Sequence, residues 1–212
     1  MRLKYAITIG DPKSAQIVAY QARSTGNSHL TREDVVTSLG VTQSRCRAGI
    51  SLIYAKYTKD GSSTLTAFTE LLRYALSQKA KYIPASQSIN AAVEILCSLV
   101  LEDFCRTIDT PGARCLCGGK GEVRDMKLSR RTGKPVMKKC SRCHGTGLRP
   151  LNHSRCHHAL NRVIQISQST YSRYWRQFYD ALLAWCIVQG NRAEAIYNAY
   201  TSLNPLLLET KI

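Results

Sequence analysis

Acidic residues are scarce in this sequence. Asp and Glu together number 14, against 30 Lys and Arg, and the 212 residues carry a formal net charge of +16 at pH 7. The excess is uneven, because residues 111–212 contain 17 basic and 5 acidic residues, whereas residues 1–110 contain 13 and 9. A basic surface concentrated in one half predicts a polyanionic partner that binds there, rather than a general means of staying in solution.

Long apolar runs are also missing. A membrane-spanning helix would need a stretch of about eighteen apolar residues, and the sequence contains none. The apolar run before Gly10 is too short for the core of a signal peptide. We therefore expect a soluble protein of a reducing cytoplasm that makes no membrane contact. In such a compartment the nine cysteines favour metal binding over disulfides.

Signatures of catalysis are absent as well. The sequence contains no P-loop, no Rossmann fingerprint and no evident Ser-His-Asp set. Its carboxylates are scattered, without the close groups that a two-metal nuclease uses. These absences predict a binding protein rather than an enzyme.

Turn-forming residues divide the chain into four segments. Residues 1–30 are mixed and polar, and predict a poorly packed arm. Residues 31–110 and 151–212 show helical periodicity, whereas residues 111–150 are rich in glycine and basic residues but poor in large apolar ones. A segment of that composition cannot bury a core of its own, so something else must hold it together. We expect a mainly α protein with a small zinc-bound β-hairpin, similar to a zinc ribbon, inserted before a C-terminal helix-turn-helix.

Glycine and proline predict where the helices end. Gly40 is expected to end a helix that begins at Thr31, Pro84 to end a later one, and Gly190 to end a long helix that begins near Ser169. In the long helix one stripe of apolar residues predicts a face turned to the core: Tyr171, Tyr174, Trp175, Phe178, Leu182, Trp185 and Cys186.

Two cysteine pairs, each followed by glycines, lie in the glycine-rich segment. Cys140 and Cys143 have the C-x2-C spacing of a zinc knuckle, and the following glycines allow the positive φ that such a turn needs. Cys115 and Cys117 are separated by a single residue, one fewer than usual. Four thiolates predict one structural Zn²⁺ in a closed site, which has no open position for catalysis. The short spacing leaves one ligand open, and four residues could replace a cysteine of the first pair: Cys105, His144, Cys156 and His157.

The segment between the cysteine pairs has the pattern of a β-hairpin. Two short arms, residues 122–128 and 135–139, flank turn-forming residues 131–134. Three cations at the expected tip could contact nucleic-acid phosphates: Arg130, Arg131 and Lys134. The alternative is a flexible, solvated loop.

Residues 153–177 have the pattern of a helix-turn-helix, a short helix and a turn followed by a second helix with a polar, basic start. Ser167 or Ser169 can cap the second helix. Arginine and glutamine in its first turns can pair with guanine and adenine edges in the DNA major groove. The candidate DNA-binding residues are Ser169, Thr170, Ser172, Arg173, Arg176 and Gln177.

Two alternatives compete with this interpretation of residues 153–177. The second helix could be an ordinary amphipathic helix whose Arg173 and Arg176 are merely solvated. An upstream segment, residues 34–50, also places a glycine before a polar start, Thr42 to Arg45, and fits the same motif. Its surroundings are less basic, which favours packing or a protein contact there.

The combination of these motifs resembles one protein family. TPGARC (residues 110–115), the two Cys/Gly knuckles and ISQSTYSR…FYDAL (residues 166–182) look like the lambda-type late antitermination protein Q of lambdoid bacteriophages. The resemblance covers roughly residues 30–200, and the sequence departs from the family pattern at the short first knuckle.

The resemblance implies a phage transcription factor in the host cytoplasm. Such proteins bind a DNA site in the late promoter and engage paused host RNA polymerase and its sigma factor. They then make the elongating enzyme read through terminators. The resemblance also implies contact with the elongation factor NusA. The resemblance puts the zinc ligands at Cys115, Cys117, Cys140 and Cys143, the DNA-reading helix at residues 169–177, and a polymerase-contact surface in residues 31–110.

Two other classes of protein fit part of the pattern. A conventional zinc-containing DNA-binding regulator would need no polymerase surface. A zinc-domain chaperone or RNA-binding module would need no specific DNA contact, and KCSRCHGTG (residues 139–147) alone also fits the DnaJ-type chaperone zinc domain.

Overall fold

The protein is mainly helical. A computed structural model describes residues 3–10, 32–85 and 89–201. In order along the chain, its elements are α1 (Leu3–Gly10), α2 (Arg32–Arg45), α3 (Arg47–Tyr57), α4 (Gly61–Tyr82), α5 (Asn90–Phe104), β1 (Glu122–Arg124), α6 (Met126–Thr132), β2 (Met137–Lys139), α7 (His153–Asn161), α8 (Gln168–Thr170), a π-helical turn (Tyr171–Trp175) and α9 (Arg176–Thr201).

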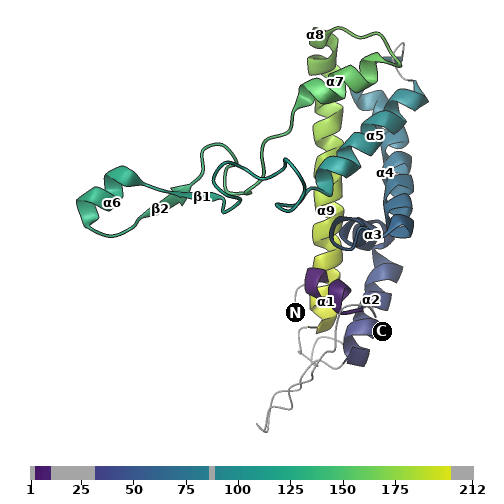
Figure 1. The fold of residues 1–212 in the computed structure, drawn as a ribbon. Coiled ribbons are helices and arrows are strands. Elements are labelled where there is room, and N and C mark those ends of the chain that lie inside the picture. Colours follow the sequence, from purple (N-terminus) through teal and green to yellow (C-terminus); the bar gives the residue numbers. More distant parts are fainter. Residues whose placement is uncertain (1–2, 11–31, 86–88, 202–212) are drawn as a thin grey trace.

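Helix α9 is the axis of a helical body. It continues from α8 and the π-helical turn, runs the length of the body, and packs against α2, α3, α4 and α5 (Figure 1). The main core lies between α4, α5, α7 and α9, where Leu71, Leu96, Trp175, Phe178 and Leu182 are fully buried. The aromatic stripe of the long helix therefore faces the core, as the sequence predicted. No helix in the described residues is both long and apolar enough to span a membrane.

A second apolar cluster lies at the other end of α9. Leu3 and Ile7 of α1 are buried there against α2, α3 and Tyr197 of α9. The prediction of a poorly packed N-terminal arm is wrong for residues 3–10, because Leu3, Ala6 and Ile7 form an apolar stripe at helical spacing. Residues 11–31 of that predicted arm lie outside the described residues.

Two glycines that were expected to end helices lie inside them. Helix α2 continues through Gly40 to Arg45, and α9 continues through Gly190 to Thr201. Gly40 itself is exposed, but its neighbours Leu39 and Thr42 are buried, and packing of the helix overrides the helix-breaking tendency of glycine. At Gly190 an added Cβ would lie 3.4 Å from Ile53 Cδ1 and 3.7 Å from Phe104 Cζ, which is ordinary van der Waals contact, so α9 packs against α3 and α5 at this position. The predicted break at Pro84 is confirmed, since α4 ends at Tyr82.

The segment between α5 and α7 leaves the body as a projecting module (Figure 1). We call residues 111–150 the cysteine module. Its strands β1 and β2 pair antiparallel, with Val123 opposite Lys138, which confirms the predicted hairpin. The connection is a helix rather than a tight turn. Asp125 begins α6 by accepting hydrogen bonds from the Lys127 and Leu128 amides, and Gly133 ends it with a φ of 67°.

Candidate metal centre and candidate nucleic-acid interface

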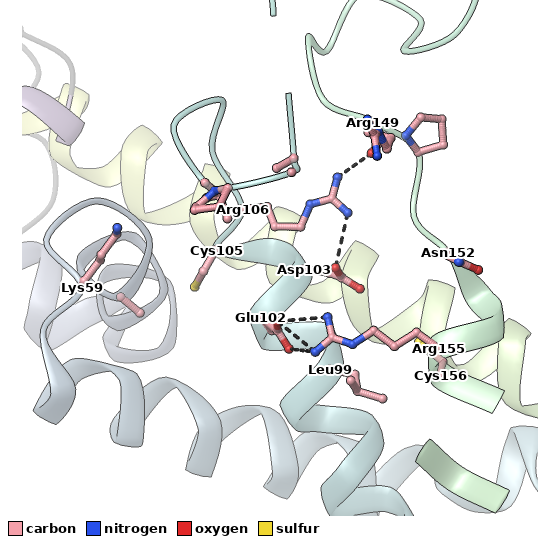
Figure 2. Close-up of a pocket in the computed structure, with 16 residues that line it drawn as sticks. Lys59, Leu99, Glu102, Asp103, Cys105, Arg106, Arg149, Asn152, Arg155 and Cys156 are labelled. Carbon is pink, nitrogen blue, oxygen red and sulfur yellow. Dashed lines mark hydrogen bonds and ion pairs between the residues drawn. The ribbon is translucent and has the colours of Figure 1, made fainter. Parts of the chain in front are cut away.

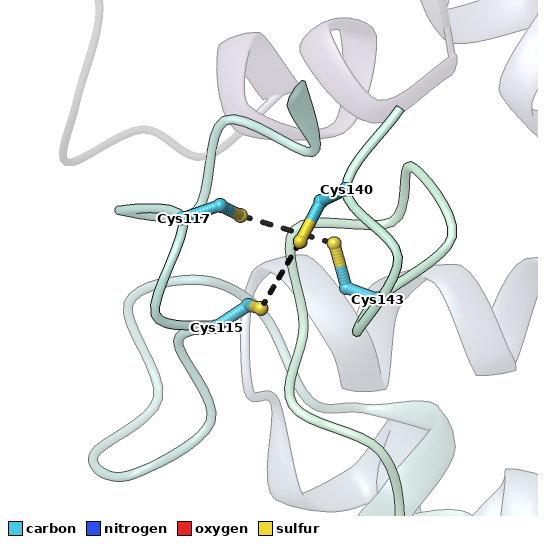
Figure 3. Close-up of side chains that lie close together, drawn as sticks. All are labelled: Cys115, Cys117, Cys140 and Cys143. Atoms are coloured by element: carbon cyan, nitrogen blue, oxygen red, sulfur yellow. Dashed lines mark hydrogen bonds between the residues drawn. The ribbon is translucent and has the colours of Figure 1, made fainter. Parts of the chain in front are cut away.

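The four cysteines of the two pairs converge on one point (Figure 3). The sulfur atoms of Cys115 and Cys140 are 4.0 Å apart, those of Cys117 and Cys143 are 3.8 Å apart, and all four lie within 4.8 Å of one another. Four thiolates bound to one Zn²⁺ at about 2.3 Å in a tetrahedron would have sulfur–sulfur separations of about 3.8 Å. The cluster could therefore hold one zinc-sized ion.

Backbone contacts hold the two knuckles face to face. The Cys115 amide donates to the Gly147 carbonyl over 2.9 Å, and the Cys140 amide donates to the Gly121 carbonyl over 2.8 Å. Each knuckle thus binds the last glycine of the other, in a twofold-like arrangement. Gly121 and Gly147 have φ values of 76° and 74°, and a Cβ added to them would lie 2.3 Å and 2.2 Å, respectively, from a carbonyl oxygen of the opposite knuckle. No residue larger than glycine fits at these two positions.

The unusual first pair keeps the same pattern with one residue fewer. Glycines stand two and four positions after the second cysteine in both knuckles, so only the stretch between the cysteines differs. Leu116 alone fills that stretch in the first knuckle, and its side chain is 73% exposed. Cys115 still reaches the cluster. In the described part of the chain, the group that could hold a metal ion consists of the four cysteines of the two pairs. It includes none of the alternative ligands Cys105, His144, Cys156 and His157.

Polar contacts fix the base of the cysteine module to the helical body (Figure 2). Arg106 follows α5, pairs with Asp103 and donates to the Arg149 carbonyl at the far end of the module. Asp103 also accepts a hydrogen bond from Tyr179 of α9, and the Arg149 amide donates to the Ala113 carbonyl over 2.7 Å. Beside them Arg155 of α7 makes an exposed, bidentate ion pair with Glu102. These contacts tie both ends of the module to α5 and α9.

Side chains also fix the connection between α7 and α8. Ser167 begins α8 by accepting a hydrogen bond from the Thr170 amide over 3.2 Å, so Ser167 rather than Ser169 is the cap. The Asn161 side chain accepts from the Ile166 amide at 3.0 Å. His157 Nε2 lies 3.0 Å from the Ile166 carbonyl, which makes it part of the turn and not of the cysteine cluster.

The candidate DNA-binding residues lie on the outer side of α8, the π-helical turn and the start of α9. Thr170 is partly buried, and the other five are exposed: Ser169, Ser172, Arg173, Arg176 and Gln177. The buried residues Tyr171, Trp175 and Phe178 face inward. The structure therefore presents these polar and basic side chains to solvent on one short helical segment.

The π-helical turn was not predicted from the sequence. It spans Tyr171–Trp175, and both of these large aromatic residues are fully buried. Because each π-helical hydrogen bond spans one residue more than an α-helical one, the α-helical period does not hold across residues 171–175, and it cannot be used to assign the candidate residues to one face. The sequence signal for this turn is two large aromatic residues four positions apart that are both buried. Amphipathic α-helices show the same spacing, so the signal does not distinguish a π-helical turn from an α-helix.

The upstream helix-turn-helix candidate is wrong. Residues 34–45 lie on a single helix, α2, and no turn follows Gly40. Thr42, expected to face a ligand, is fully buried and donates a hydrogen bond to the Ser38 carbonyl. A break in the helix occurs only at Cys46, so the polar residues stand at the end of one helix and not at the start of the next.

The three phosphate-contact candidates are exposed at the far end of the cysteine module. Arg130 and Arg131 belong to α6, and Lys134 follows the glycine that ends it. Further cations lie there that the sequence pattern did not indicate. Arg124, Lys127 and Lys138 line a depression of about 560 Å³ together with Arg131. Their spacing did not suggest a common site because α6 brings residues from both strands together.

The fold and site define a class: a basic, mainly helical protein with a four-cysteine cluster in a projecting module. A family model described as antitermination protein Q matches residues 109–194, which span the module, α7 and most of α9. The chain is 30% identical over 207 residues to antitermination protein Q of Escherichia phage lambda, with 95% of this chain and the whole relative covered. It is 29% identical over 208 residues to the same-named protein of Salmonella phage P22, with the same coverage. The chain belongs to the phage antitermination protein Q family, whose name describes a regulator of transcription and not an enzyme.

Proposed function

We propose that this protein is a phage antitermination factor. It binds a DNA site in the late promoter, loads onto host RNA polymerase paused nearby with its sigma factor, and makes the enzyme read through terminators into late genes. The observation that carries this proposal is the similarity over 95% of the chain to complete phage proteins named for antitermination. Contact with the elongation factor NusA belongs to the same proposal.

We propose that α7 and the start of the long helix act as a helix-turn-helix that binds DNA. Its six candidate residues comprise exposed hydroxyl, amide and guanidinium groups, which suit base edges and phosphates in the major groove. Arg130, Arg131 and Lys134 of the cysteine module are proposed to contact phosphates. The exposed surfaces of residues 31–110 are the proposed region of polymerase contact, within a body whose core also includes α7 and α9.

One structural Zn²⁺ is proposed to bind Cys115, Cys117, Cys140 and Cys143. The module contains eleven basic and two acidic residues, and its described buried apolar residues are few apart from the cysteines themselves. A closed tetrahedral site would replace the missing core and set the direction in which the module projects.

A terminator read-through assay tests the proposed function. Purified host polymerase would transcribe a template that carries the late promoter of the phage encoding this chain, followed by a terminator, with and without the protein. We expect longer transcripts only when the protein and the promoter-proximal site are both present. The matched control template has that site replaced by unrelated sequence of equal length.

Two results would contradict the proposal in different ways. Tight, specific binding to the late-promoter DNA without read-through would indicate a conventional DNA-binding regulator. Read-through that is equal on the control template would show that promoter-site recognition is not part of the activity.

A further inference from the structure

A pocket of about 350 Å³ lies between the cysteine module and the helical body. Phe104 of α5 and the α9 residues Leu183 and Ile187 line it from the body. Leu148 near the end of the module and Leu151 just after it also line the pocket. Ile187 is 48% exposed, although it is a large apolar residue. The pocket therefore has an apolar floor that is open to solvent.

The rim of this pocket is strongly basic. Four cations line it, and three of them come from the module or its junction: Lys56, Arg106, Arg142 and Arg149. The single carboxylate in the lining, Asp103, already pairs with Arg106 and accepts a hydrogen bond from Tyr179. Within the described residues, the side chains of Arg142 and Arg149 make no ion pair with any carboxylate. Burial lowers the pKa of Lys56, which is the direction expected where no nearby carboxylate compensates the ammonium.

We propose that this pocket binds a segment of a partner protein in which a large apolar side chain is flanked by Asp or Glu residues. The apolar side chain would occupy the floor formed by Leu148, Leu183 and Ile187. The flanking carboxylates would pair with the cations of the rim. Interfaces commonly concentrate their binding energy in one such buried anchor surrounded by polar contacts.

The lining favours a protein segment over a nucleic-acid base. Bases bind in single-stranded sites mainly by stacking on exposed aromatic faces. Two aromatic rings line the pocket, Phe104 and His144. Phe104 is only 8% exposed, and Lys56 Nζ lies 4.7 Å from its ring centroid, whereas His144 belongs to the knuckle wall and not to the floor. The remaining floor is aliphatic. Aliphatic walls suit a leucine, isoleucine or tryptophan side chain, whereas a phosphate backbone gains nothing from them.

The second cysteine knuckle forms one wall of the pocket, through Cys143, His144 and Thr146. The pocket is therefore complete only when the module holds its position on the body. This inference does not depend on antitermination, because peptide binding to the pocket can be tested without DNA or polymerase.

Fluorescence anisotropy with labelled nonapeptides tests the proposal on the full-length, zinc-loaded protein. The probe has the sequence DEELWLEED, with three apolar residues between acidic flanks. One control peptide replaces the apolar residues with glycine, and a second replaces the acidic residues with asparagine and glutamine. We expect the probe to bind at least about tenfold more tightly than either control, because anchor and charge both contribute.

Matched protein variants locate the binding. Ile187→Glu should weaken probe binding at least about tenfold, whereas Val188→Glu should leave it within twofold, because Val188 is as exposed but does not line the pocket. Arg142→Glu should likewise weaken probe binding at least about tenfold. Its control in the module, Lys120→Glu, should leave binding within twofold, because Lys120 does not line the pocket. Circular dichroism checks that each variant folds, and the arginine pair keeps the test decisive if Ile187→Glu unfolds.

Several results would overturn the proposal. These are no binding of the probe, equal binding of the glycine control, or equal effects of the variants in each pair. If Ile187→Glu abolishes the binding of a single-stranded oligonucleotide but not that of the probe, the pocket binds nucleic acid instead. Sedimentation showing a dimer that Ile187→Glu alone dissociates would assign it to a second copy of the chain. Failure of the peptide assay would leave the proposed antitermination function untouched.

Discussion

At the residue scale, glycine decides the geometry of the candidate metal centre as much as cysteine does. Gly121 and Gly147 each have a positive φ and touch the backbone of the opposite knuckle. The two contacts place the Cys115 and Cys140 amides against carbonyls across the centre. The glycines therefore bring the thiols together, and a metal ion would bind a site that the backbone has already shaped.

Two glycine substitutions separate backbone strain from steric contact. Gly121→Ala would place a Cβ 2.3 Å from the Gly145 carbonyl oxygen, whereas Gly133→Ala meets nothing within 4 Å, and both residues have a positive φ. Each variant carries the cost of a left-handed alanine, about 1–2 kcal/mol. We expect Gly121→Ala to weaken zinc affinity at least about tenfold relative to Gly133→Ala, which should bind zinc normally. This is the size of effect seen when residues that support metal ligands are changed. Competition with a chromophoric chelator measures this, and equal affinities would show that the knuckle contact does not shape the site.

At the element scale, the sequence predicted which segments are helical better than where the helices end. The apolar periodicity of residues 90–104 and 176–186 is strong enough to identify α5 and the start of α9. Neither Gly40 nor Gly190 ends its helix, because residues that follow each glycine are buried where α2 and α9 pack: Thr42 in α2, and Ala193 and Tyr197 in α9. Local signals contain no information about such contacts, which is also why the π-helical turn was missed.

The candidate site was predicted in the same way, in part. The cysteine spacing identified all four members of the cluster, and the helix-turn-helix pattern identified side chains that are exposed. The basic-rimmed pocket was not predicted, because Lys56, Phe104, Arg142 and Ile187 come from four separate elements. Only the fold brings them together, and no motif joins residues that far apart in the chain.

Arginine substitutions test which helix reads DNA. Arg173→Ala should weaken binding to the late-promoter site by roughly 5- to 150-fold and reduce discrimination against unrelated DNA, if Arg173 pairs with a base edge. Arg45→Ala is the control, since Arg45 lies at the end of α2 over the Tyr200 ring, and specific affinity should not change. Anisotropy at one fixed salt concentration, with specific and unrelated duplexes, measures both. A loss on Arg45→Ala but not on Arg173→Ala would move the DNA contact to α2.

At the scale of the whole molecule, two parts are stable for different reasons. The helical body buries a continuous core along α9, which includes Leu71, Leu96, Trp175 and Leu182. The cysteine module has a cluster made only of its cysteines and Val123. Its basic side chains repel one another, so without an ion the module has little to offset the entropy of ordering its backbone.

Metal removal should therefore unfold one part and leave the other. On treatment with a strong chelator, we expect the Cys115 and Cys140 amides, which bond to Gly147 and Gly121 across the centre, to lose their protection from hydrogen exchange. Amides inside α9 should keep theirs, and far-UV circular dichroism should fall only slightly because α6 is short.

Lowering the pH should have the same effect as the chelator, since protonated thiols do not bind zinc. Because the second knuckle forms a wall of the basic-rimmed pocket, probe peptide binding should be lost together with module protection. Protection in α9 that is lost in the same step would mean that module and body unfold as one cooperative unit, held together by the Arg106 contacts rather than stabilised separately.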